Sequence, residues 1–484
     1  MIKADNLNRG QYNIGGYQEP EGIHYQIGSV DMRYIRHCVV IICVAITRLS
    51  PLLAASDNTE TYTFASQRQV GHIDHVNILL EASGDVLTKS GTSEKPERLE
   101  VGLTCRRDYD EKTLEIPTTS EKTLRSVRYY HEASATLRKG TVAQTPALRP
   151  ESQIIGVEIV GGKSTLFSPK GPFSMDELEL VTAVGESLCL DQLLPGNPVK
   201  IGSLWRISDD TIALLLGLDE VTSNSVQMAL NEVTPEFARF ELVGQVEGKL
   251  FGASNQINLK AKCRFDRQTG RIDWFAMRLK QNRDIGVVED GLDATVLVQA
   301  KITRLEIAEK LSDAVLADLS LKLTDERMLV RYLQSGGGCQ LTHDRSWFLI
   351  DRTRDQDEFH RLDRGQDIGL CKISPQPQVH VSNLPSLEQF QGIVQKLLGT
   401  NLAEFSELSQ VETPAHLRIL RVKAKGKDNA VPVGWFYYLV SDPEGRQVMF
   451  AFRVEEKRLA AFGRADEQLV HSLRFVEKKD PGSK

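Results

Sequence analysis

The sequence predicts an α+β protein with two β-rich halves. In the first half, apolar residues recur at every second position over long runs, as in 76–116 and 238–275, which indicates half-buried strands. Breaks rich in Asp and Gly separate these runs and are typical of antiparallel hairpins. In the second half, short strands surround one amphipathic helical pattern at 385–399. We therefore expect a curved antiparallel sheet followed by an α/β sandwich.

The beginning of the chain has the composition of a leader and an export signal. Residues 1–31 are rich in Gly, Gln and Asn without an apolar period, and we interpret them as an untranslated or disordered leader, with translation starting at Met32. Residues 32–56 begin with two arginines, Arg33 and Arg36, which a short apolar run and then small residues follow, and this is the order of a secretory signal peptide. A short buried helix is the alternative. We expect cleavage close to Ala55 or Ser56 and a periplasmic or secreted protein.

Composition limits the partners. The chain has 59 Lys and Arg and 65 Asp and Glu; five of the former and four of the latter precede residue 57, so the remainder carries a net charge of −7. A mildly acidic, mixed-charge protein argues against a nucleic-acid partner, because phosphate binding needs a basic surface. After residue 56 we find no apolar segment of the roughly 20 residues that a membrane helix needs. We therefore expect no transmembrane anchor.

Residues 57–300 form the first expected domain, and two of its stretches repeat one order. Each has an alternating strand with a glycine, Gly84 or Gly244, then a second strand that ends in a cysteine, Cys105 or Cys263, then an acidic turn. We expect two related β-meanders in one curved sheet, which makes an internal duplication a candidate. The alternative is that two unrelated hairpins share a pattern.

Two features of this half resemble known secreted proteins. A long curved antiparallel sheet, with the helix expected at 176–190 on its concave side, resembles the lipoprotein-carrier fold of the LolA/LppX type. The phrase VKIGSLW at 199–205 resembles a phrase of uncharacterised secreted bacterial β-proteins. The carrier resemblance implies a half-barrel that shelters acyl chains, but no residue can be carried over from it.

A helical linker is expected at 301–327. The apolar period changes there to roughly helical intervals, with Ile302, Leu305, Ile307, Leu311 and Leu316 on one stripe.

The second half, residues 328–478, resembles the Mog1/PsbP-like α/β sandwich, including its bacterial DUF1795-type group. The features that match are the strand RSWFLID, the Leu-rich helix at 385–399, the aromatic strand GWFYYLV, its partner VMFAFRVEEKRL and the closing segment LVHSLRF. Members of this fold serve as binding or assembly modules, so the resemblance implies no shared catalytic site. Residues 479–484 are expected to be a disordered tail.

Three motifs resemble catalytic, metal or cofactor sites, but each lacks a feature that such a site requires. VGGKST has Lys163 and Ser164, but a phosphate loop needs a glycine where Val157 stands. In HIDH, a strand would place His72 and Asp74 on one face and turn the next histidine away, which disfavours a metal site. In THDRSWF no nucleophile elbow of the form G-x-S-x-G surrounds the serine. We therefore assign no catalytic residue, metal ligand or cofactor site.

Two residue pairs remain as candidates. Cys339 and Cys371 are 32 residues apart in a protein that we expect in an oxidising compartment, so they form either a disulfide or two buried thiols. Trp435 and Tyr437 share one face of the aromatic strand. This face either stacks a ligand or belongs to the core.

Three classes of function remain open. The first is a non-enzymatic binding or assembly module with an unknown protein partner. The alternative is a carrier that holds a lipid or another apolar small molecule on the curved sheet. The third is an enzyme whose site is assembled from scattered residues, which we favour least.

Overall fold

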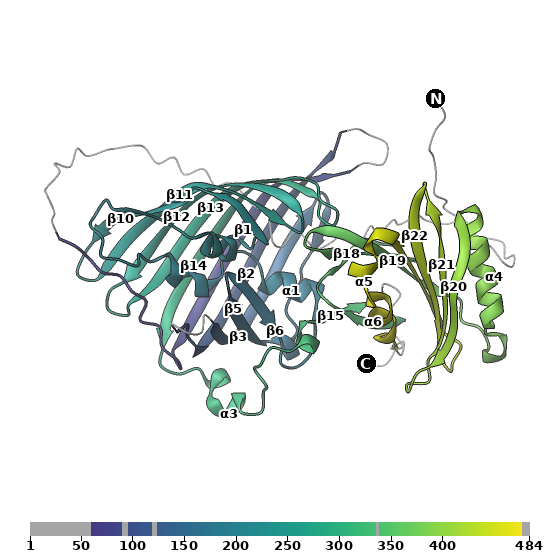
Figure 1. The fold of residues 1–484 in the computed structure, drawn as a ribbon. Helices are drawn as coiled ribbons and strands as arrows, with labels where there is room; N and C mark the ends of the chain where they lie inside the picture. Colours follow the sequence, from purple (N-terminus) through teal and green to yellow (C-terminus); the bar gives the residue numbers. More distant parts are fainter. Residues whose placement is uncertain (1–59, 90–94, 119–122, 335–337, 477–484) are drawn as a thin grey trace.

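The computed structural model describes residues 60–89, 95–118, 123–334 and 338–476 (Figure 1). The expected leader (1–31), signal peptide (32–56) and C-terminal tail (479–484) lie outside the described residues. Most described elements are antiparallel strands and a few are helices, so the α+β class is confirmed. None of the described helices has the length and apolar character that a membrane crossing requires.

One large antiparallel sheet makes up the first half, and it is strongly curved (Figure 1). Its strands in spatial order are β6 (Lys163–Phe167), β5 (Ile154–Val160), β3 (Leu124–Lys139), β2 (Glu97–Glu115), β1 (Ile73–Thr88), β14 (Gly291–Leu305), β13 (Arg271–Arg283), β12 (Ala253–Asp266), β11 (Phe237–Leu250), β10 (Gln227–Val233) and β8 (Leu204–Arg206). Two short strands, β4 (Val142–Gln144) and β9 (Glu220–Asn224), pair with β3 and β11. The pairing of β1 with β14 joins the two expected meanders side by side.

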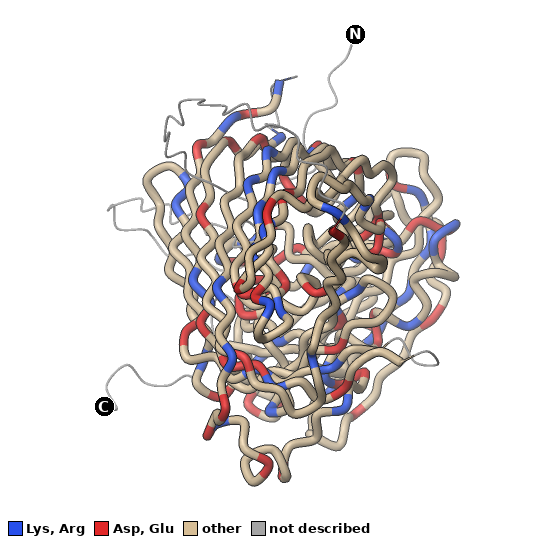
Figure 2. Tube along the Cα trace, turned by 90° about the vertical axis from the view of Figure 1, so that its left-hand side faces the viewer, with Lys and Arg blue, Asp and Glu red and all other residues tan. Residues whose placement is uncertain are grey.

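The concave face of this sheet is filled by the chain itself. In β12, buried and exposed residues alternate strictly, as a sheet with one wet face requires. The buried face packs against α1 (Met175–Val181), η3 (Ser187–Leu193) and α2 (Asp209–Leu216) in one apolar cluster. Acidic and basic residues are interspersed along the strands of the sheet (Figure 2).

Buried ion pairs hold the inner segment against the sheet. Arg128 of β3 donates to Glu111 of β2 at 2.7 Å and also pairs with Glu186, which precedes η3. Burial raises the pKa of Glu111, but Arg128 and Arg68 more than offset this and keep the carboxylate charged. A second group joins Arg271 to Asp191 of η3 at 3.2 Å. Because a buried charge is costly unless it is paired, these contacts fix where the segment lies.

The segment expected to be a helical linker is mostly not helical. Strand β14 continues to Leu305, so Ile302 faces the core as a strand residue. Beyond it lie only η4 (Glu309–Leu311), α3 (Asp313–Leu316) and η5 (Asp325–Met328). The expectation of one helical stripe is wrong because the alternating pattern of the sheet runs five residues into it. The remaining part packs on the outer face, where Leu311 lies in an apolar cluster with Val127.

A seven-stranded antiparallel sheet forms the second half. Its order is β17 (Trp347–Arg352), β18 (Asp357–Asp363), β19 (Gln366–Gln376), β23 (Gln447–Glu455), β22 (Val431–Ser441), β21 (Arg418–Asp428) and β20 (Leu402–Glu412). Helix α4 (Leu387–Leu398) covers one face, and α5 (Leu459–Phe462) and α6 (Ala465–His471) lie on the other (Figure 1). Short 3-10 turns complete the chain: η2 (Pro150–Ser152), η6 (Val381–Asn383), η7 (Gly399–Asn401) and η8 (Glu456–Arg458).

Helix α4 lies within the range 385–399 that the sequence predicted to be helical. Ser386 and Gln389 form a capping box, in which each side chain bonds the other residue's main chain. The helix ends at Gly399, whose φ of 52° suits a residue without Cβ.

A small mixed sheet connects the halves. Its order is β24 (Arg474–Phe475), β16 (Cys339–His343), β15 (Val330–Leu333) and β7 (Phe173–Ser174), and β7 comes from the first half. The pairing of β15 with β7 is parallel. Arg345 adds a hydrogen bond of 2.7 Å to the carbonyl oxygen of Leu166. The halves are therefore connected by a strand pairing and by a side-chain hydrogen bond, and their independence as domains stays a prediction.

Candidate functional site

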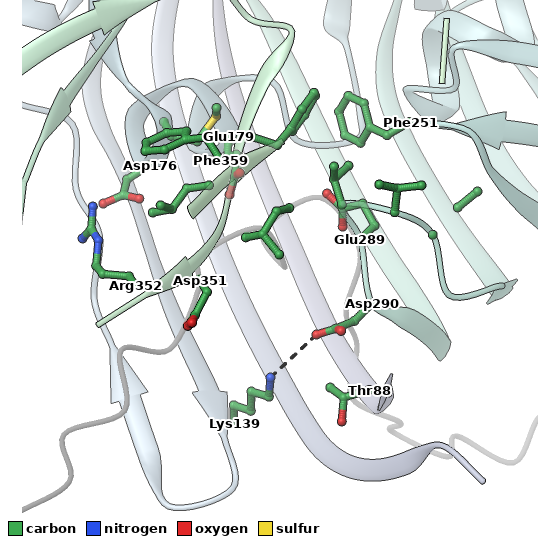
Figure 3. Close-up of a pocket in the computed structure, with 18 of the residues that line it drawn as sticks. Thr88, Lys139, Asp176, Glu179, Phe251, Glu289, Asp290, Asp351, Arg352 and Phe359 are labelled. Carbon is green, nitrogen blue, oxygen red and sulfur yellow. Dashed lines mark ion pairs between the residues drawn. The ribbon is translucent and has the colours of Figure 1, made fainter. Parts of the chain in front are cut away.

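A pocket of about 1640 Å³ lies where one end of the curved sheet meets the second half (Figure 3). The first half supplies the ends of β1 and β3, the β11–β12 turn and the loop that leads from β13 to β14. The second half supplies β15, β17 and part of β18. Ligand sites are often found between domains, so we take this pocket as the candidate site.

Aromatic rings from both halves form the apolar part of the wall. Phe251, in the β11–β12 turn, meets Phe348 of β17 edge to face, with ring centroids 4.8 Å apart. Tyr332 of β15 meets Phe359 of β18 in the same way at 4.9 Å. Phe251 and Phe348 belong to a small apolar cluster with Val288 that bridges the halves. The two ring pairs thus belong to two neighbouring parts of the pocket wall.

Two further apolar side chains lie open to solvent in this wall. Val287 is 46% exposed and Leu333 is 49% exposed. They come from the β13–β14 loop and from β15, that is, from opposite halves. Single exposed apolar residues are ordinary, but a pair that lines one pocket from both sides marks a surface that a ligand could cover.

Charged groups line the rest of the pocket. Lys139 and Asp290 form an ion pair at 3.9 Å across it (Figure 3). Asp176, at the start of α1, lies beside Arg352 of β17, whose guanidinium lies 5.0 Å from the centre of the Tyr332 ring (Figure 3). The wall thus offers an apolar surface next to both positive and negative groups. Such a wall suits an amphipathic ligand with a charged or polar end.

His343 also lines the pocket, but its contacts are structural. Its Nδ1 lies 2.7 Å from the carbonyl oxygen of Asp344, and its ring packs against Phe359 with centroids 5.7 Å apart. Burial lowers the pKa of His343, so the ring is neutral near pH 7. The side chain of Asp344 accepts hydrogen bonds from Ser346 in a tight turn. Asp344 and Ser346 of the THDRSWF motif therefore shape a turn before β17, and His343 is the last residue of β16.

Of the two alternatives for Trp435 and Tyr437, the structure shows the core and not an open face that could stack a ligand. Both side chains lie in the apolar cluster beneath α4, where Phe390 and Val394 cover them. Trp435 is 7% exposed. The reason is that α4 buries this face of the sheet, so the rings are core, the alternative that the sequence left open.

The candidate disulfide between Cys339 and Cys371 is not formed. Both are free and buried thiols. Cys339 lies on β16 of the small sheet and Cys371 on β19 of the seven-stranded sheet, although both contribute to one apolar cluster. Because two different sheets hold their backbones, the second alternative, two buried thiols, is the one that the structure shows.

The structure also forms neither a phosphate loop at VGGKST nor a shared face for the residues of HIDH. Gly161 and Gly162 have φ of 55° and 74° and form the β5–β6 hairpin turn, in place of a phosphate loop. Asp74 faces the core and pairs with Arg271 at 3.0 Å. His75 faces the other side of the sheet and contacts Asp110. Alternation thus correctly predicted that Asp74 and His75 face opposite sides of the sheet. It could not predict which residues of neighbouring strands lie beside them.

The sequence did not predict the pocket, because its lining residues are up to 277 positions apart along the chain, from Thr88 to Gly365. Two dipeptides carried a signal: Phe251-Gly252 and Arg364-Gly365 are two-residue hairpin turns, and both reach the pocket. Only the tertiary structure shows that these two turns contact each other.

The concave face does not offer the open groove that a carrier of the LolA/LppX type needs. Leu180, Leu190 and Leu215 of the inner segment are buried against it. An apolar ligand bound there would have to displace them. Among the described residues, the pocket between the halves is therefore the better candidate for ligand binding.

No known protein family model matches the chain, and no curated protein matches it. Among solved structures, cyanobacterial PsbP from Synechocystis is similar over 31% of this chain and 93% of its own, with 15% identity and a TM-score of 0.25. The Ran-binding protein Mog1p from Saccharomyces cerevisiae is similar over 31% and 96%, with 13% identity and a TM-score of 0.25. The expected Mog1/PsbP-like resemblance is thus confirmed in part, as a weak likeness of fold. The expected LolA/LppX-like resemblance of the first half finds no support.

Proposed function

We propose that this chain is an exported, non-enzymatic binding protein, and that its ligand occupies the pocket between the two halves. The observation that carries the proposal is the composition of the wall, to which both halves contribute rings, an exposed aliphatic side chain and charged groups. Because residues of both halves would contact the ligand, its binding would also stabilise the present arrangement of the two halves.

The size of the pocket suggests what the ligand is. Sites for small molecules usually enclose roughly 300–1,000 Å³. This pocket, at about 1640 Å³, is larger and partly open. We therefore favour a large amphipathic ligand, such as a long-chain amphiphile, over a compact metabolite. Its apolar part would cover Val287, Leu333 and the ring of Phe251, and its polar end would lie near Lys139 or Arg352.

Native mass spectrometry of protein purified from its own cells tests the proposal. A bound amphiphile should appear as a mass above that of the protein and should be identified after release. Val287→Asp places a charge in the apolar wall and should lower the affinity for that amphiphile by about tenfold or more, since burying an unpaired charge is costly. Because Val287 is already half exposed, the substitution should leave the fold intact.

Val411→Asp is the matched control. Val411 lies on β20, is 51% exposed and does not line the pocket, so the same substitution there should leave the affinity unchanged. Protein that carries no bound amphiphile and captures none from a lipid extract would contradict the proposal. Equal losses in the two variants would contradict the location.

Export belongs to the same proposal and is tested separately. The support is the order of charge, apolar run and small residues in 32–56. N-terminal sequencing of the protein from its own cells should find a first residue close to Asp57. A chain that begins at Met1 in the cytoplasm would contradict it.

A further inference from the structure

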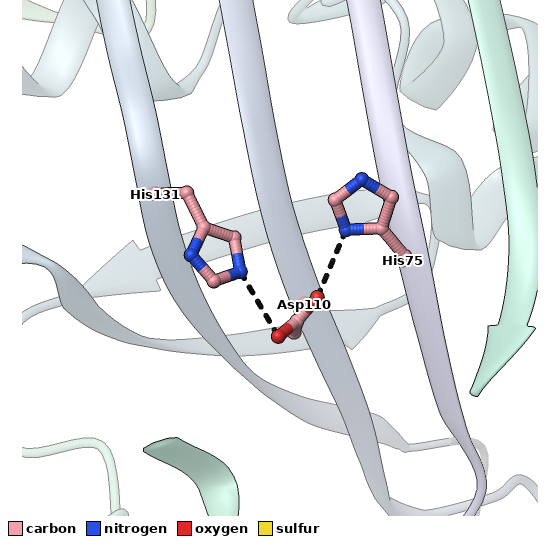
Figure 4. A group of neighbouring side chains, drawn as sticks. All are labelled: His75, Asp110 and His131. Atoms are coloured by element: carbon pink, nitrogen blue, oxygen red, sulfur yellow. Dashed lines mark hydrogen bonds and ion pairs between the residues drawn. The ribbon is translucent and has the colours of Figure 1, made fainter. Parts of the chain in front are cut away.

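Three potential metal ligands meet on the exposed face of the curved sheet, away from the pocket. They are His75 of β1, Asp110 of β2 and His131 of β3 (Figure 4). Nδ1 of His75 lies 2.9 Å from one carboxylate oxygen of Asp110, and Nε2 of His131 lies 3.0 Å from the other. All three ligand atoms lie within 4.8 Å of one another.

Strand pairing explains how residues far apart in sequence meet. His75 and Asp110 are direct partners in the antiparallel pair of β1 and β2. The register of β2 and β3 shifts by one residue at this level, because Asp108 lies opposite Glu132 and Tyr109 lies opposite Tyr130. His131 is therefore the extra residue of a β-bulge. Bulges of this kind redirect a side chain and are often found next to functional sites.

The bulge decides which way the third ligand points. Tyr130 is fully buried on the core face, whereas the next two residues, His131 and Glu132, are both exposed. In a regular strand only one of two successive side chains would face outward. The extra residue thus keeps Tyr130 in the core and aligns His131 with Asp110.

Neighbouring groups orient both imidazole rings. Asp108 lies 3.6 Å from Nε2 of His75, and Asn77 donates to the same carboxylate at 3.2 Å. The contact of Nε2 of His75 with Asp108 is an ion-pair distance and not a hydrogen bond, and Nδ1 of the same ring faces Asp110. The ring of Tyr129 packs edge-on against His131, with centroids 5.1 Å apart. An outer carboxylate that fixes a histidine is a regular feature of protein metal sites.

We propose that His75, Asp110 and His131 bind a divalent transition-metal ion, and that Zn²⁺ is a suitable one. Two imidazole nitrogens and one carboxylate oxygen are ligands that Zn²⁺ accepts, at distances of about 2.0–2.2 Å. Four ligands at this distance in a tetrahedron are about 3.3 Å apart, so small side-chain rotations from the present geometry suffice. Three protein ligands leave one position for water or for a group of a partner.

The metal would replace the two hydrogen bonds that Asp110 now accepts. Its carboxylate already lies between the rings, so the ligands are held together before the ion arrives. The side chains of His75 and His131 are 36% and 43% exposed, which gives an ion access from solvent.

Calorimetric titration with ZnCl₂ tests this proposal on the full chain, purified without a polyhistidine tag and treated with a chelator. We expect one Zn²⁺ per chain. His131→Gln and Asp110→Asn each remove a ligand and should weaken binding by more than tenfold. Asp108→Asn, which removes the outer partner of His75, should weaken it by about tenfold. Because the side chain of His131 is 43% exposed, its variant should fold even if Asp110→Asn does not.

His416→Gln is the matched control. His416 is a highly exposed histidine that lies 3.7 Å from Glu412, so it offers an imidazole and a carboxylate without a second imidazole. Its substitution should leave Zn²⁺ affinity unchanged. Binding that His131→Gln leaves unchanged, or that His416→Gln weakens equally, would overturn the proposal. So would the absence of stoichiometric binding, which would assign the three residues to hydrogen bonding alone.

Discussion

Gly252 and Gly365 touch each other where the two halves of the protein meet. A Cβ atom on Gly252 would lie 2.2 Å from the carbonyl oxygen of Gly365, and a Cβ atom on Gly365 would lie 2.5 Å from the Cα of Gly252. Each is the second residue of a two-residue hairpin turn with positive φ, of 82° and 74° respectively. Turns of this kind favour glycine, and here the absence of a side chain also lets two hairpins from different halves approach.

Gly365→Ala should therefore destabilise the contact between the halves. The clash and the left-handed backbone together should lower the free energy of unfolding by roughly 2–4 kcal/mol, measured by chemical denaturation. Gly463→Ala is the control, because Gly463 has a similar φ of 58° and open space where a Cβ would lie. It should cost only about 1–2 kcal/mol. Equal losses would show that the contact between the hairpins contributes nothing.

Proteolysis of the segment between the halves tests whether they stay together. Ile307 is 76% exposed and follows the last strand of the large sheet, so we expect cleavage between β14 and β15. After cleavage, the two fragments should co-elute in gel filtration, because β7 pairs with β15 and Arg345 bonds Leu166. In Gly365→Ala protein they should separate more readily. Fragments that separate at once and remain folded would show two independent domains.

Trp435→Ala should destabilise the protein as a core truncation does. Removing a buried tryptophan from beneath α4 should cost roughly 3–5 kcal/mol of unfolding free energy. Trp274→Ala is the comparison, since Trp274 is 37% exposed on the outer face of β13 and should cost less than about 1 kcal/mol. If Trp435→Ala lowers stability no more than Trp274→Ala does, the ring is not core and the stacking role returns.

Cys339 and Cys371 should behave as inert thiols. Burial raises the pKa of Cys339 to about 12, and burial also raises that of Cys371 far above its ordinary value. Because the thiolate is the reactive form, neither residue should react with a thiol reagent in folded protein. Both should react after unfolding without reductant. A peptide that contains both cysteines in a non-reducing map would restore the disulfide.

His360 should make stability depend on pH. Burial lowers its pKa, but hydrogen bonds to Asp367 at 2.8 Å and Glu358 at 3.2 Å outweigh this and raise it to about 9. A histidine whose pKa is raised on folding stabilises fully below its unfolded pKa, about 6.5, and this contribution is lost as pH rises to about 9. The loss should be roughly 2–3 kcal/mol.

Denaturation at pH 6 and at pH 9.5 measures this loss. His360→Gln protein should be less stable than the natural chain at pH 6 and should lack this part of the decline at higher pH. His416→Gln should retain it, because His416 is on the surface. A decline of the same size in His360→Gln would assign the pH dependence to other groups.

The sequence by itself determined the local structure where a repeating pattern met a single environment. Strict alternation in 253–266 became a strand with one wet face, and Ser386 with Gln389 began a helix that ended at Gly399. These are short-range matters, since propensity, capping and the period of apolar residues act within a few residues of one another. The pattern misled at Ile302, where an alternating strand also fits a helical spacing over a short window.

The tertiary structure decided everything that depends on which strands are neighbours. Leu80 lies opposite Cys105 and Phe240 lies opposite Cys263, and in each hairpin the glycine of the repeated order, Gly84 or Gly244, stands four residues further along the first strand. The two hairpins therefore share one register at these positions, and the duplication stays a prediction. Whether the face of Trp435 is open or covered depended on where α4 packs.

The two sites have the same origin. The pocket needs a loop of the first half to meet β15 and β17 of the second, and the metal-ligand cluster needs a one-residue bulge that turns His131 toward Asp110. Pairing register and close packing between distant segments fix these contacts, because a shift of a single residue moves every side chain of a strand to the other face. The sequence shows the residues of such a site, but it does not show which distant segments position them.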